Sequence, residues 1–349
     1  MLLLQTALEQ ARFRGPLAIA CATAWASVAG RTVVRRLDLP PRTRVITVGG
    51  ATLGGSGKTP LAMACAAELA ARGARVALVG HAYRANPRAA RIVVPNDSLQ
   101  EVGDEALLAA RTLGPAGIRV IVAPRRSDAV ALAGRVADIL VLDGVAQTSP
   151  VRAALALLAV DAREPWGRGG AVAPRGDLRA PKPILLRACD GVVSIADGSD
   201  TEVDMAENSE GTFGAWRGRA ASRGVWVGGN LRTWDDLAGL RLGLLCAIAR
   251  PERVIHSLKK RGIGLLAVVR ARDHGPVPAN VFARAARAAR GARGEPRIDL
   301  WLATQKCFVH FGAPRGGVGN ILHAPIGAID HALQLSATLV QRLGALAAP

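Results

Sequence analysis

The residues best suited to chemistry lie in a glycine-rich stretch, residues 49–60, that ends in Gly57, Lys58, Thr59 and a proline. Glycines let a backbone fold closely round an anion, with successive N–H groups pointing inward. A lysine at this place would neutralise the β- and γ-phosphates of a nucleotide, and the threonine hydroxyl would bind Mg²⁺. We therefore predict a phosphate-binding loop, or P-loop, that holds ATP with Thr52, Gly54, Gly55, Ser56, Gly57, Lys58 and Thr59.

The surroundings of this stretch decide between two interpretations. The strict pattern G-x-x-x-x-G-K-[ST] has glycine at position 52, where this chain has Thr52. The alternative is a glycine-rich turn that is followed by Lys58 and Thr59 through chance. However, a β-branched apolar run, residues 45–48, enters the loop, and an alanine-rich helical pattern leaves it. This order of strand, loop and helix favours nucleotide binding, because the helix adds the positive end of its dipole.

Acidic residues lie at the ends of predicted strands and at the starts of predicted helices after the P-loop, where a metal ligand or a catalytic base is expected. Asp143 ends the apolar run of residues 139–142 and is suited to bind Mg²⁺ beside the P-loop. A plain turn residue or helix cap is the alternative for Asp143. Asp104 and Glu105 begin a helical run, where acidic side chains also serve as a cap and favour the helix dipole.

One histidine stands at the end of a predicted strand in the second half of the chain. Asp273 and His274 follow the apolar run of residues 265–269 across a short basic link. An Asp-His pair at a strand's carboxyl end could orient or tune a base, although a lone histidine is more often a surface residue.

Composition narrows the class of protein and its partners. With 349 residues, half of them apolar, the chain is long enough for two domains with a sizeable core. The formal charge of +18 indicates an anionic partner. Nucleic acid is the weakest candidate, because one tyrosine and five phenylalanines leave few rings for bases to stack on. Five widely separated cysteines without a C-x-x-C pair suit a reduced, cytosolic setting.

The N-terminal region suggests contact with a membrane. Residues 15–30 carry no charge and are flanked by arginines at positions 12, 14, 31, 35 and 36. The stretch is shorter than the roughly 20 apolar residues of a crossing helix. We expect a helix that lies in the membrane surface, with arginines reaching anionic headgroups. The alternative is a soluble helix packed on the protein.

The elements that position these residues alternate between strand and helix. Between residues 44 and 160 we expect strands at 44–48, 75–79, 119–122, 139–142 and 155–160, with helices at 58–72, 104–113 and 126–136. Such alternation predicts a parallel sheet covered by helices on both faces, with ligands at the carboxyl ends of the strands. Residues 167–183 are predicted to form a long loop.

The second half repeats the alternation after a polar, glycine-rich segment, residues 197–228. We expect strands at 242–248, 264–269 and 300–303, helices at 251–261 and 280–290, and a closing helix at 330–346. The predicted architecture is α/β and P-loop NTPase-like. It comprises an N-terminal membrane-associated region (1–40), a nucleotide-binding domain with a mostly parallel sheet (41–228) and a smaller C-terminal α/β lobe that completes the site (229–349).

Several of these motifs together resemble one enzyme family. The loop of residues 52–60, T-x-G-G-x-G-K-T-P, resembles the phosphate loop of the tetraacyldisaccharide 4′-kinase (lipid A 4′-kinase) family, in which Thr52 is expected. Further matches arrive in the family's order: V-G-D-E at 102–105, Arg126, L-D-G-V-A-Q at 142–147, the loop at 166–181, A-I-A-R-P-E-R at 247–253 and D-H at 273–274. The resemblance runs from the N-terminal basic region to Lys306.

The chain departs from the family's motifs at several positions near the expected site. Where the family has two consecutive aspartates, this chain has Asp143 and Gly144, and Gly275 replaces the second histidine of D-H-H. The family's S-R-G-Y-G is G-H-A-Y-R at residues 80–84, so His81 stands where the family has arginine. The family's T-E-K-D is T-Q-K-C at residues 304–307. Each loss removes a polar group, which affects the expected Mg²⁺ binding and rate.

The resemblance implies a kinase that phosphorylates the 4′-hydroxyl of a tetraacylated glucosamine disaccharide 1-phosphate, at the cytoplasmic face of the bacterial inner membrane. ATP and Mg²⁺ would be its cofactors, and the acylated disaccharide-phosphate lipid and an anionic membrane surface its partners. Thr59, Asp143 and Glu105 would bind Mg²⁺. Asp104, supported by His274, would accept the hydroxyl proton, and Arg179 would steady phosphate charge beside Lys58. The rivals are another P-loop kinase or ligase for a small molecule, and a catalytically weakened nucleotide-binding scaffold at the membrane.

Overall fold

The computed structural model describes residues 13, 15–82, 85–167, 169–197, 213–248, 251–271, 279–288, 297–310 and 324–347. The chain divides into two compact units. The larger unit consists of Met1–Ala196, Asp200–Arg219 and Leu333–Pro349, and the smaller one of Asp197–Ser199 and Ala220–Ala332. The smaller unit is thus inserted into the larger one. The sequence-based boundary at 228/229 differs from this division, and the last helix of the chain lies in the larger unit.

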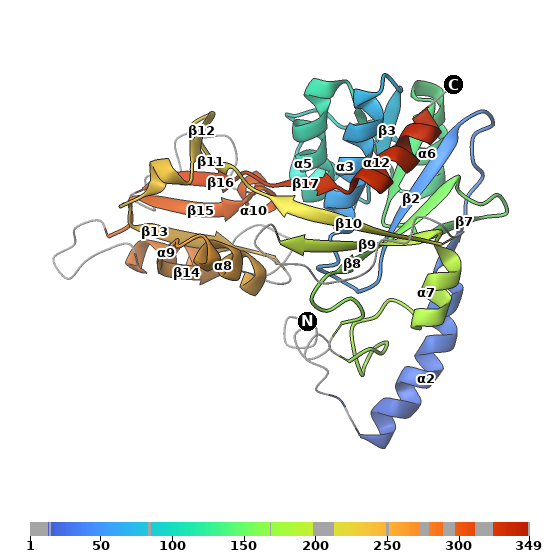
Figure 1. Cartoon of the computed structure of the whole chain (residues 1–349), viewed down its shortest axis with the longest axis horizontal. Coiled ribbons are helices and arrows are strands. Elements are labelled where there is room, and N and C mark those ends of the chain that lie inside the picture. The colour runs from blue at the N-terminus through green and yellow to red at the C-terminus, as the bar shows by residue number, and fades with distance from the viewer. Residues whose placement is uncertain are drawn as a thin grey trace. The chain divides into compact units, whose positions relative to one another are not determined.

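A nine-stranded sheet forms the centre of the larger unit (Figure 1). Six neighbouring strands are parallel, and β4 is antiparallel to β5. In spatial order the strands are β17 (Ala332–Leu335), β10 (Gly214–Ala221), β9 (Gly191–Asp197), β8 (Leu155–Asp161), β2 (Arg44–Gly50), β6 (Ile139–Asp143), β3 (Val76–Val79), β5 (Arg119–Val122) and β4 (Arg91–Ile92). The strand that leads into the P-loop, β2, therefore lies between β8 and β6, in the middle of the sheet.

Helices cover both faces of this sheet. On one face, α6 (Arg126–Val136) buries Ala129, Val130 and Ala133 against side chains of β2, β3, β5 and β6. On the same face, α7 (Lys182–Ala188) packs on β8 and β9. The other face carries α3 (Lys58–Ala71), with α5 (Asp104–Leu113) and α12 (Ala337–Ala347) beside it. Right-handed crossovers place α3 and α6 on opposite faces, because β2→β3 and β5→β6 run in opposite directions along the sheet. The predicted mostly parallel sheet with helices on both faces is confirmed.

The edge of the sheet beyond β9 differs from the sequence-based expectation. Residues 332–335 form β17 and not the first turn of a closing helix, which begins only at Ala337. Leu333 and Leu335 alternate with Ala332 and Gln334, the period of a strand, and the Leu333 side chain packs against Gly218 of β10. The expected boundary segment 197–228 likewise contains β10 and β11 (Gly224–Val227).

The N-terminal helix α2 (Pro16–Arg31) lies side by side with α7 (Figure 1). Ala22 and Ala29 of α2 are buried in the cluster that includes Leu185 of α7. A Cβ at Gly30 would stand 2.7 Å from Ile184 Cδ1, so the two helices approach closely there and a larger residue would require the Ile184 side chain to shift. Within the described part of the chain, no helix has both the length and the apolar character to cross a membrane.

After α2, a short parallel pair joins β1 (Val34–Arg36) to β7 (Gln147–Ser149), just beyond the end of β6. The remaining short elements of the larger unit are α4 (Leu99–Val102) and the 3₁₀ turn η1 (Gly114–Ala116).

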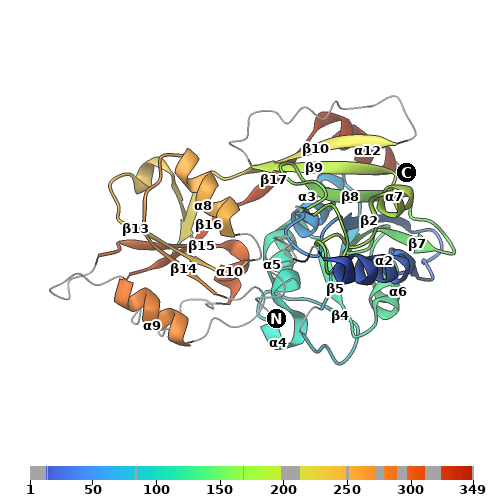
Figure 2. The ribbon, with the colours of Figure 1, turned by 90° about the horizontal axis from the view of Figure 1, so that it is seen from below.

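The smaller unit has its own sheet and core. Its strand order is β12 (Asn230–Thr233), β11, β16 (Ile326–Ile329), β15 (Leu300–Thr304), β13 (Leu242–Cys246) and β14 (Leu265–Arg270). The last four are parallel to one another, and β11 is antiparallel to both of its neighbours. Figure 2 shows this sheet with its helices α8 (Pro251–Lys260), α9 (Ala279–Ala288) and α10 (Gln305–Val309). The turn η2 (Asp235–Leu237) follows β12.

Candidate functional site

The glycine loop connects β2 to α3 in the middle of the large sheet. Gly57 caps α3 with a φ of +80°, a left-handed conformation that favours glycine. A Cβ at Gly57 would also stand only 2.5 Å from Ile195 Cδ1, and one at Gly50 only 2.2 Å from Ser56 Oγ. The left-handed backbone therefore disfavours a side chain at Gly57, and one at Gly50 would require the Ser56 side chain to move. Lys58 is the first residue of α3, so its side chain starts at the positive end of the helix dipole.

Thr59 and Asp143 meet beside this loop. β2 and β6 are parallel neighbours in which Val48 pairs with Asp143, so the carboxylate stands next to the start of the P-loop. The Thr59 hydroxyl donates to Asp143 Oδ2 at 2.7 Å. Asp143 Oδ1 is buried and has no hydrogen-bond partner among the described residues. Burial raises the pKa of Asp143, while Lys58, Thr59 and Arg126 lower it and Glu105 raises it further.

These two oxygens suit a hard cation. Mg²⁺ is usually held by one or two protein oxygens and completes its shell with water and phosphate oxygens. Thr59 Oγ1 and the unpartnered Asp143 Oδ1 provide such oxygens, and Mg²⁺ bound there would neutralise phosphate charge. No group of three or more His, Cys, Asp or Glu side chains within the described ranges forms a ready-made metal centre. Thr59 Oγ1 and Asp143 Oδ1 are two oxygens of the kind that bind Mg²⁺ together with water and phosphate oxygens.

Arg126 forms a hydrogen bond with the last residue of β6, Asp143. This half-buried residue, the first of α6, donates from Nη1 to the Asp143 carbonyl oxygen at 2.8 Å. A Cβ built on Gly144, which has a φ of +79°, would lie 3.8 Å from Arg126 Nη2 and 3.9 Å from Lys58 Cε. Two cations thus border the position at which the chain leaves β6.

The long loop before α7 is tied to the P-loop. Residues 169–181 form no helix or strand, as expected, apart from isolated bridges such as Thr52 to Leu178. Arg179 donates from Nε to the Thr52 carbonyl at 2.9 Å and from Nη2 to the Leu53 carbonyl at 3.3 Å. Thr52 is buried, and its hydroxyl donates to the Gly54 carbonyl at 2.7 Å. Thr52 therefore shapes the loop through its side chain, and the Arg179 guanidinium holds the loop backbone.

Asp104 and Glu105 lie at the start of α5, and their side chains differ in setting. Gly103 is the N-cap residue of this helix, with a φ of +85° and no side-chain cap. Asp104 is buried, and its Oδ1 accepts a hydrogen bond from the Glu105 N–H at 2.8 Å. Burial lowers the pKa of Arg179 and raises that of Asp143; the negative charge of Glu105 opposes the first shift and adds to the second. Both acidic residues thus belong to the larger unit, as the P-loop does.

Comparison with known proteins places this arrangement in a family. The family model Tetraacyldisaccharide-1-P 4′-kinase matches residues 17–313. The chain belongs to this family. It is 34% identical over 242 residues to a tetraacyldisaccharide 4′-kinase from Anaeromyxobacter sp. (strain Fw109-5), an alignment that covers 66% of this chain and 64% of that protein, less than two thirds of it. It is 33% identical to the enzyme of the same name from Methylobacterium radiotolerans, with 74% of this chain and 76% of that protein covered.

A solved structure agrees with the fold of this tetraacyldisaccharide 4′-kinase family member. The crystal structure of LpxK from Aquifex aeolicus, in complex with ATP, has a TM-score of 0.64. The alignment covers 94% of this chain and 97% of that structure's chain. The sequence identity is 16%, so the comparison shows similarity of fold. The predicted family and the predicted P-loop NTPase-like fold are both confirmed.

The structure brings most of the predicted site residues of this family member together. Lys58, Thr59, Asp143, Asp104, Glu105 and Arg179 all lie in the larger unit at or near the carboxyl ends of its strands. His274 and its neighbour Asp273 lie outside the described residues, so their predicted role stays a prediction. The binding and catalytic roles of the individual residues likewise remain predictions.

Two basic residues near the site were not among the predicted site residues. Desolvation and then Arg126 lower the pKa of His81 to about 4, with Lys58 and Arg35 acting in the same direction and Glu105 opposing. Burial chiefly lowers the pKa values of Arg126 and Arg179, and the positive charge of Arg35, on β1, adds to this. The departure from the family's S-R-G-Y-G already marked His81. No sequence signal pointed to Arg35, because its place depends on the pairing of β1 with β7.

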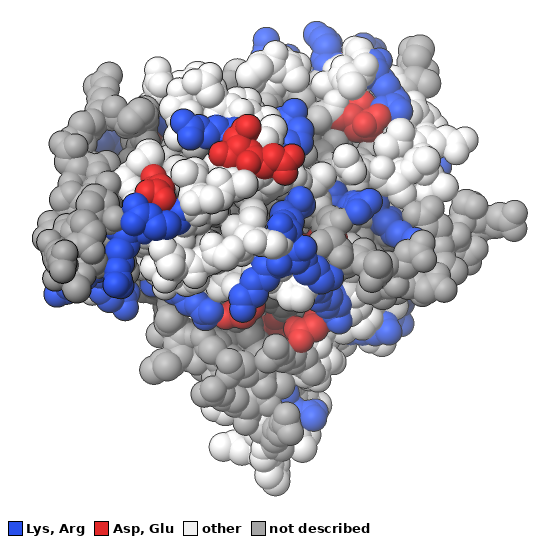
Figure 3. Space-filling view, turned by 60° about the vertical axis from the view of Figure 1, so that its left-hand side comes forward, with Lys and Arg blue, Asp and Glu red and all other residues white. Residues whose placement is uncertain are grey.

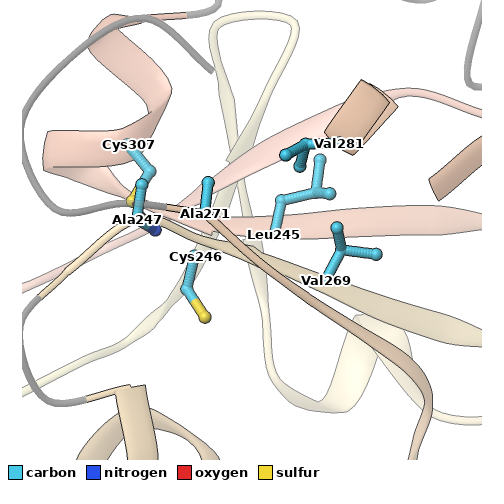
Figure 4. A pocket seen from close by; sticks show the side chains of 7 residues that line it. All are labelled: Leu245, Cys246, Ala247, Val269, Ala271, Val281 and Cys307. Carbon is cyan, nitrogen blue, oxygen red and sulfur yellow. Dashed lines mark hydrogen bonds between the residues drawn. The ribbon is translucent and has the colours of Figure 1, made fainter. Parts of the chain in front are cut away.

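The smaller unit contains a small, mainly apolar cavity. Figure 4 shows the seven residues that line it: Leu245, Cys246, Ala247, Val269, Ala271, Val281 and Cys307. Its volume of about 10 Å³ corresponds to no more than one water molecule. The lining is mainly apolar, and the Cys307 sulfur accepts hydrogen bonds from the Ala247 N–H and the Thr304 hydroxyl, both at 3.0 Å. Among the described residues, a volume of this size is too small for a nucleotide or a disaccharide.

Proposed function

We propose that this chain transfers the γ-phosphoryl group of ATP to the 4′-hydroxyl of a tetraacylated glucosamine disaccharide 1-phosphate, a step of lipid A biosynthesis. The observation that carries the proposal is the Thr59–Asp143 hydrogen bond of 2.7 Å beside a left-handed glycine loop. Phosphoryl transfer needs this combination of phosphate cradle and metal-binding oxygens. Family membership identifies the acceptor, since the named relatives are tetraacyldisaccharide 4′-kinases.

Each predicted site residue has a separate role in the proposed reaction. Lys58 and the N–H groups of the loop bind the β- and γ-phosphates, and Thr59 and Asp143 bind Mg²⁺ with Glu105 nearby. Arg179 holds the loop backbone at Thr52 and Leu53, and it adds positive charge to the phosphate site. Asp104 accepts the proton of the acceptor hydroxyl, because a buried carboxylate at the start of a helix is fixed in place. His274 assists Asp104 in this role.

We further propose that α2 binds the membrane surface that contains the acceptor. Leu17, Ile19, Trp25 and Val28 are between 45% and 78% exposed, although they are large and apolar. Arg31, Arg35 and Arg36 follow them and are exposed as well. Apolar side chains on a short helix with arginines at its end suit the interface of an anionic membrane. Over the face in Figure 3, Lys and Arg cover more of the visible surface than Asp and Glu. The inner membrane's cytoplasmic face supplies both ATP and this lipid.

The decisive experiment incubates the purified full chain with ATP, Mg²⁺ and the tetraacyldisaccharide 1-phosphate, and follows the product by mass. We expect the lipid to gain one phosphoryl group. Lys58→Ala should slow the transfer by about 10²–10³-fold, in line with the loss of one preorganised electrostatic contact. Lys259→Ala, an exposed lysine of α8, is the control and should leave the rate unchanged. No phosphorylated lipid from the wild-type chain would overturn the proposal.

Gly144 favours one second candidate, a nucleotide-binding scaffold that has lost catalysis. The family's second aspartate is missing there, and two cations border the space. The same incubation decides between the two, because a scaffold would bind ATP and leave the lipid unphosphorylated.

A further inference from the structure

A lysine and a tryptophan meet beside the N-terminal helix. Lys182, the first residue of α7, has its Nζ 4.7 Å from the centroid of the Trp166 ring. Trp166 belongs to the segment before α7 and packs, half-buried, against the core cluster that contains Ala22 and Ala29 of α2. A cation over the face of an indole ring is attracted by the ring's quadrupole. The ammonium group of Lys182 is therefore held close to the junction of α7 and α2.

The ammonium group of Lys182 has hydrogen-bond donors to spare. Lys182 is exposed, and no acceptor for its Nζ is found in the described part of the chain. An ammonium group has three N–H donors, so contact with one ring leaves donors for the oxygens of a ligand. The ring thus orders a long, flexible side chain without an acceptor of the protein taking up its charge.

A second cation lies at the same junction. α2 and α7 come into contact at Gly30 and Ile184, where a Cβ on the glycine would stand 2.7 Å from Ile184 Cδ1. Arg31, the last residue of α2, directly follows Gly30, and Lys182 precedes Ile184 by two residues. Arg31 is exposed as well, and it has no acidic partner among the residues that the structure describes. The contact between the two helices thus has a cation close to it on each helix.

The surface of α2 indicates what kind of ligand reaches these cations. Leu17, Trp25 and Val28 are exposed although they are large and apolar. Apolar and aromatic side chains followed by basic ones are typical of a helix in a membrane interface, where the basic groups lie at the level of the lipid headgroups. An anion at this junction is therefore best supplied by the membrane, because a free anion in water gains nothing from the apolar side chains.

We propose that Lys182, held over Trp166 and assisted by Arg31, binds the phosphate group of an anionic phospholipid headgroup. The proposal rests on the proposed placement of α2 on the membrane surface, and it adds a contact from α7. The N–H groups of Lys182 donate to the phosphate oxygens, and the Arg31 guanidinium adds positive charge. Lys182 comes three residues after Arg179, which holds the P-loop backbone, so the lipid is bound by the same segment that supports the nucleotide site.

Vesicle binding by charge variants of the full chain tests this site. Lys182→Gln, Lys182→Arg and Arg88→Gln are compared with wild type on phosphatidylcholine vesicles with and without phosphatidylglycerol, in the absence of ATP and of the lipid acceptor. On the phosphatidylglycerol vesicles, Lys182→Gln should weaken binding about fivefold, the usual contribution of one basic residue near an anionic surface. Lys182→Arg keeps the charge and the contact with the ring, so it should bind within about twofold of wild type. The control Arg88→Gln removes an exposed charge just before β4, at the opposite edge of the sheet from β9, and should have almost no effect.

Trp166 provides a second measurement that separates the proposed role from plain packing. Trp166→Leu keeps an apolar side chain but removes the ring, so it should weaken vesicle binding about two- to fivefold in the wild-type background. In the Lys182→Gln background it should cause no further loss, because the two residues act together. A tryptophan that only fills the core would give the same loss in both backgrounds, and that result overturns its proposed role. Melting temperatures identify unfolded variants, and if Trp166→Leu is one of them, Trp166→Phe takes its place and should bind vesicles as wild type does.

The site is overturned if Lys182→Gln binds anionic vesicles as wild type does, if Arg88→Gln weakens binding as much, or if Lys182→Arg binds as weakly as Lys182→Gln. Normal vesicle binding by Lys182→Gln with a raised KM for the acceptor in neutral detergent micelles would assign the site to the acceptor's own phosphate, and would also overturn it. Failure of the proposed kinase activity is seen separately, because vesicle binding needs neither ATP nor acceptor. A wild-type chain that does not bind anionic vesicles would overturn both this site and the membrane contact of α2.

Discussion

Asp143 shows how single atoms set up the site. One carboxylate oxygen accepts from Thr59, the other is buried without a partner among the described residues, and the carbonyl accepts from Arg126. A buried, unsatisfied carboxylate oxygen is costly, and the cost is relieved when a cation binds. The nearby charges of Lys58 and Arg126 reduce it in the free protein. The free carboxylate oxygen of Asp143 is therefore suited to bind the metal of a metal–nucleotide complex.

Asp104→Asn separates the proposed base from a purely structural residue. The Asn oxygen can still accept the Glu105 N–H bond, so the melting temperature and ATP affinity should stay near wild type. Turnover should fall by about 10²–10⁴-fold, the usual contribution of a positioned proton acceptor. Steady-state kinetics with the lipid acceptor measures the effect. Asp128→Asn, in the first turn of α6, is the matched control, and an unchanged turnover in Asp104→Asn would rule out the base assignment.

At this scale the sequence predicted the residues whose place follows from a local pattern. Lys58 and Thr59 follow a glycine loop, and Asp143 ends an apolar strand, so adjacency along the chain was enough. Arg35 and His81 lie near the site only through strand pairing. Their proximity to Arg126 depends on long-range register, which a single sequence does not contain.

At the scale of elements, the loop of residues 169–181 depends on a few contacts to keep its shape. It has no ladder of its own, and Arg179 joins it to the P-loop with two side-chain hydrogen bonds and a backbone bond to the Ala51 carbonyl. Because of these bonds, a shift of this loop would also shift the backbone of the P-loop at residues 51–53.

Arg179→Lys should therefore weaken ATP binding while conserving charge. Lysine lacks the planar fork that reaches the Thr52 and Leu53 carbonyls together. Hydrogen bonds to charged groups contribute about 1.5–3 kcal/mol each, so we expect a lower free energy of unfolding and a raised KM for ATP. Chemical denaturation and kinetics measure both. Arg187→Lys on the exposed side of α7 should change neither, and wild-type values in Arg179→Lys would mean that the fork is not needed.

The helix α2 gives a prediction about membrane binding. Replacing Leu17 and Trp25 by glutamine should reduce binding to anionic vesicles without lowering the melting temperature, because both side chains are exposed. Binding of the wild-type chain should weaken with salt, since each arginine near the surface contributes roughly 1 kcal/mol by attraction to headgroups. Vesicle co-sedimentation measures it, with Ser27→Gln as the control. Equal wild-type binding to neutral and anionic vesicles at low salt would contradict the interfacial helix.

Among the elements, the sequence predicted the central strands and the long helices of the larger unit, but it did not predict β10 and β17. Strands such as β2 and β6 are continuous apolar runs, which are easily recognised. β10 includes two arginines and a tryptophan, and β17 has only four residues, so neither gives a strong period. β17 is the edge strand of the sheet and β10 lies next to it; an edge strand has one partner and one open side, so its composition is mixed.

At the scale of the whole molecule, the larger unit is completed by the far end of the chain. Leu339 and Leu343 of α12 are fully buried, and α12 packs on α3, the helix that begins at Lys58. The two helices lie side by side (Figure 1). Contacts of α12 therefore support the helix that carries Lys58 and Thr59.

Leu339→Ala should destabilise the larger unit by about 2–5 kcal/mol, the usual effect of emptying a buried leucine site. Because α3 loses its neighbour's packing, ADP should protect the variant against thermal unfolding less than it protects wild type. Differential scanning fluorimetry with and without ADP measures both effects. Gln341→Ala, on the exposed side of the same helix, should behave as wild type. A fully stable Leu339→Ala variant would show that α12 is dispensable for the P-loop unit.

The insertion of the smaller unit also has a consequence for the order of events during synthesis. β17 and α12 are translated only after Ala220–Ala332, a stretch that takes several seconds at roughly 5–20 residues per second. The residues of the smaller unit are therefore synthesised while α3 still lacks its covering helix. Until the last turn of α12 emerges, the nascent chain exposes the apolar surface that Leu339 and Leu343 later cover. Chaperones that bind such surfaces have their longest opportunity here, and a chain that stops early lacks a finished nucleotide-binding unit.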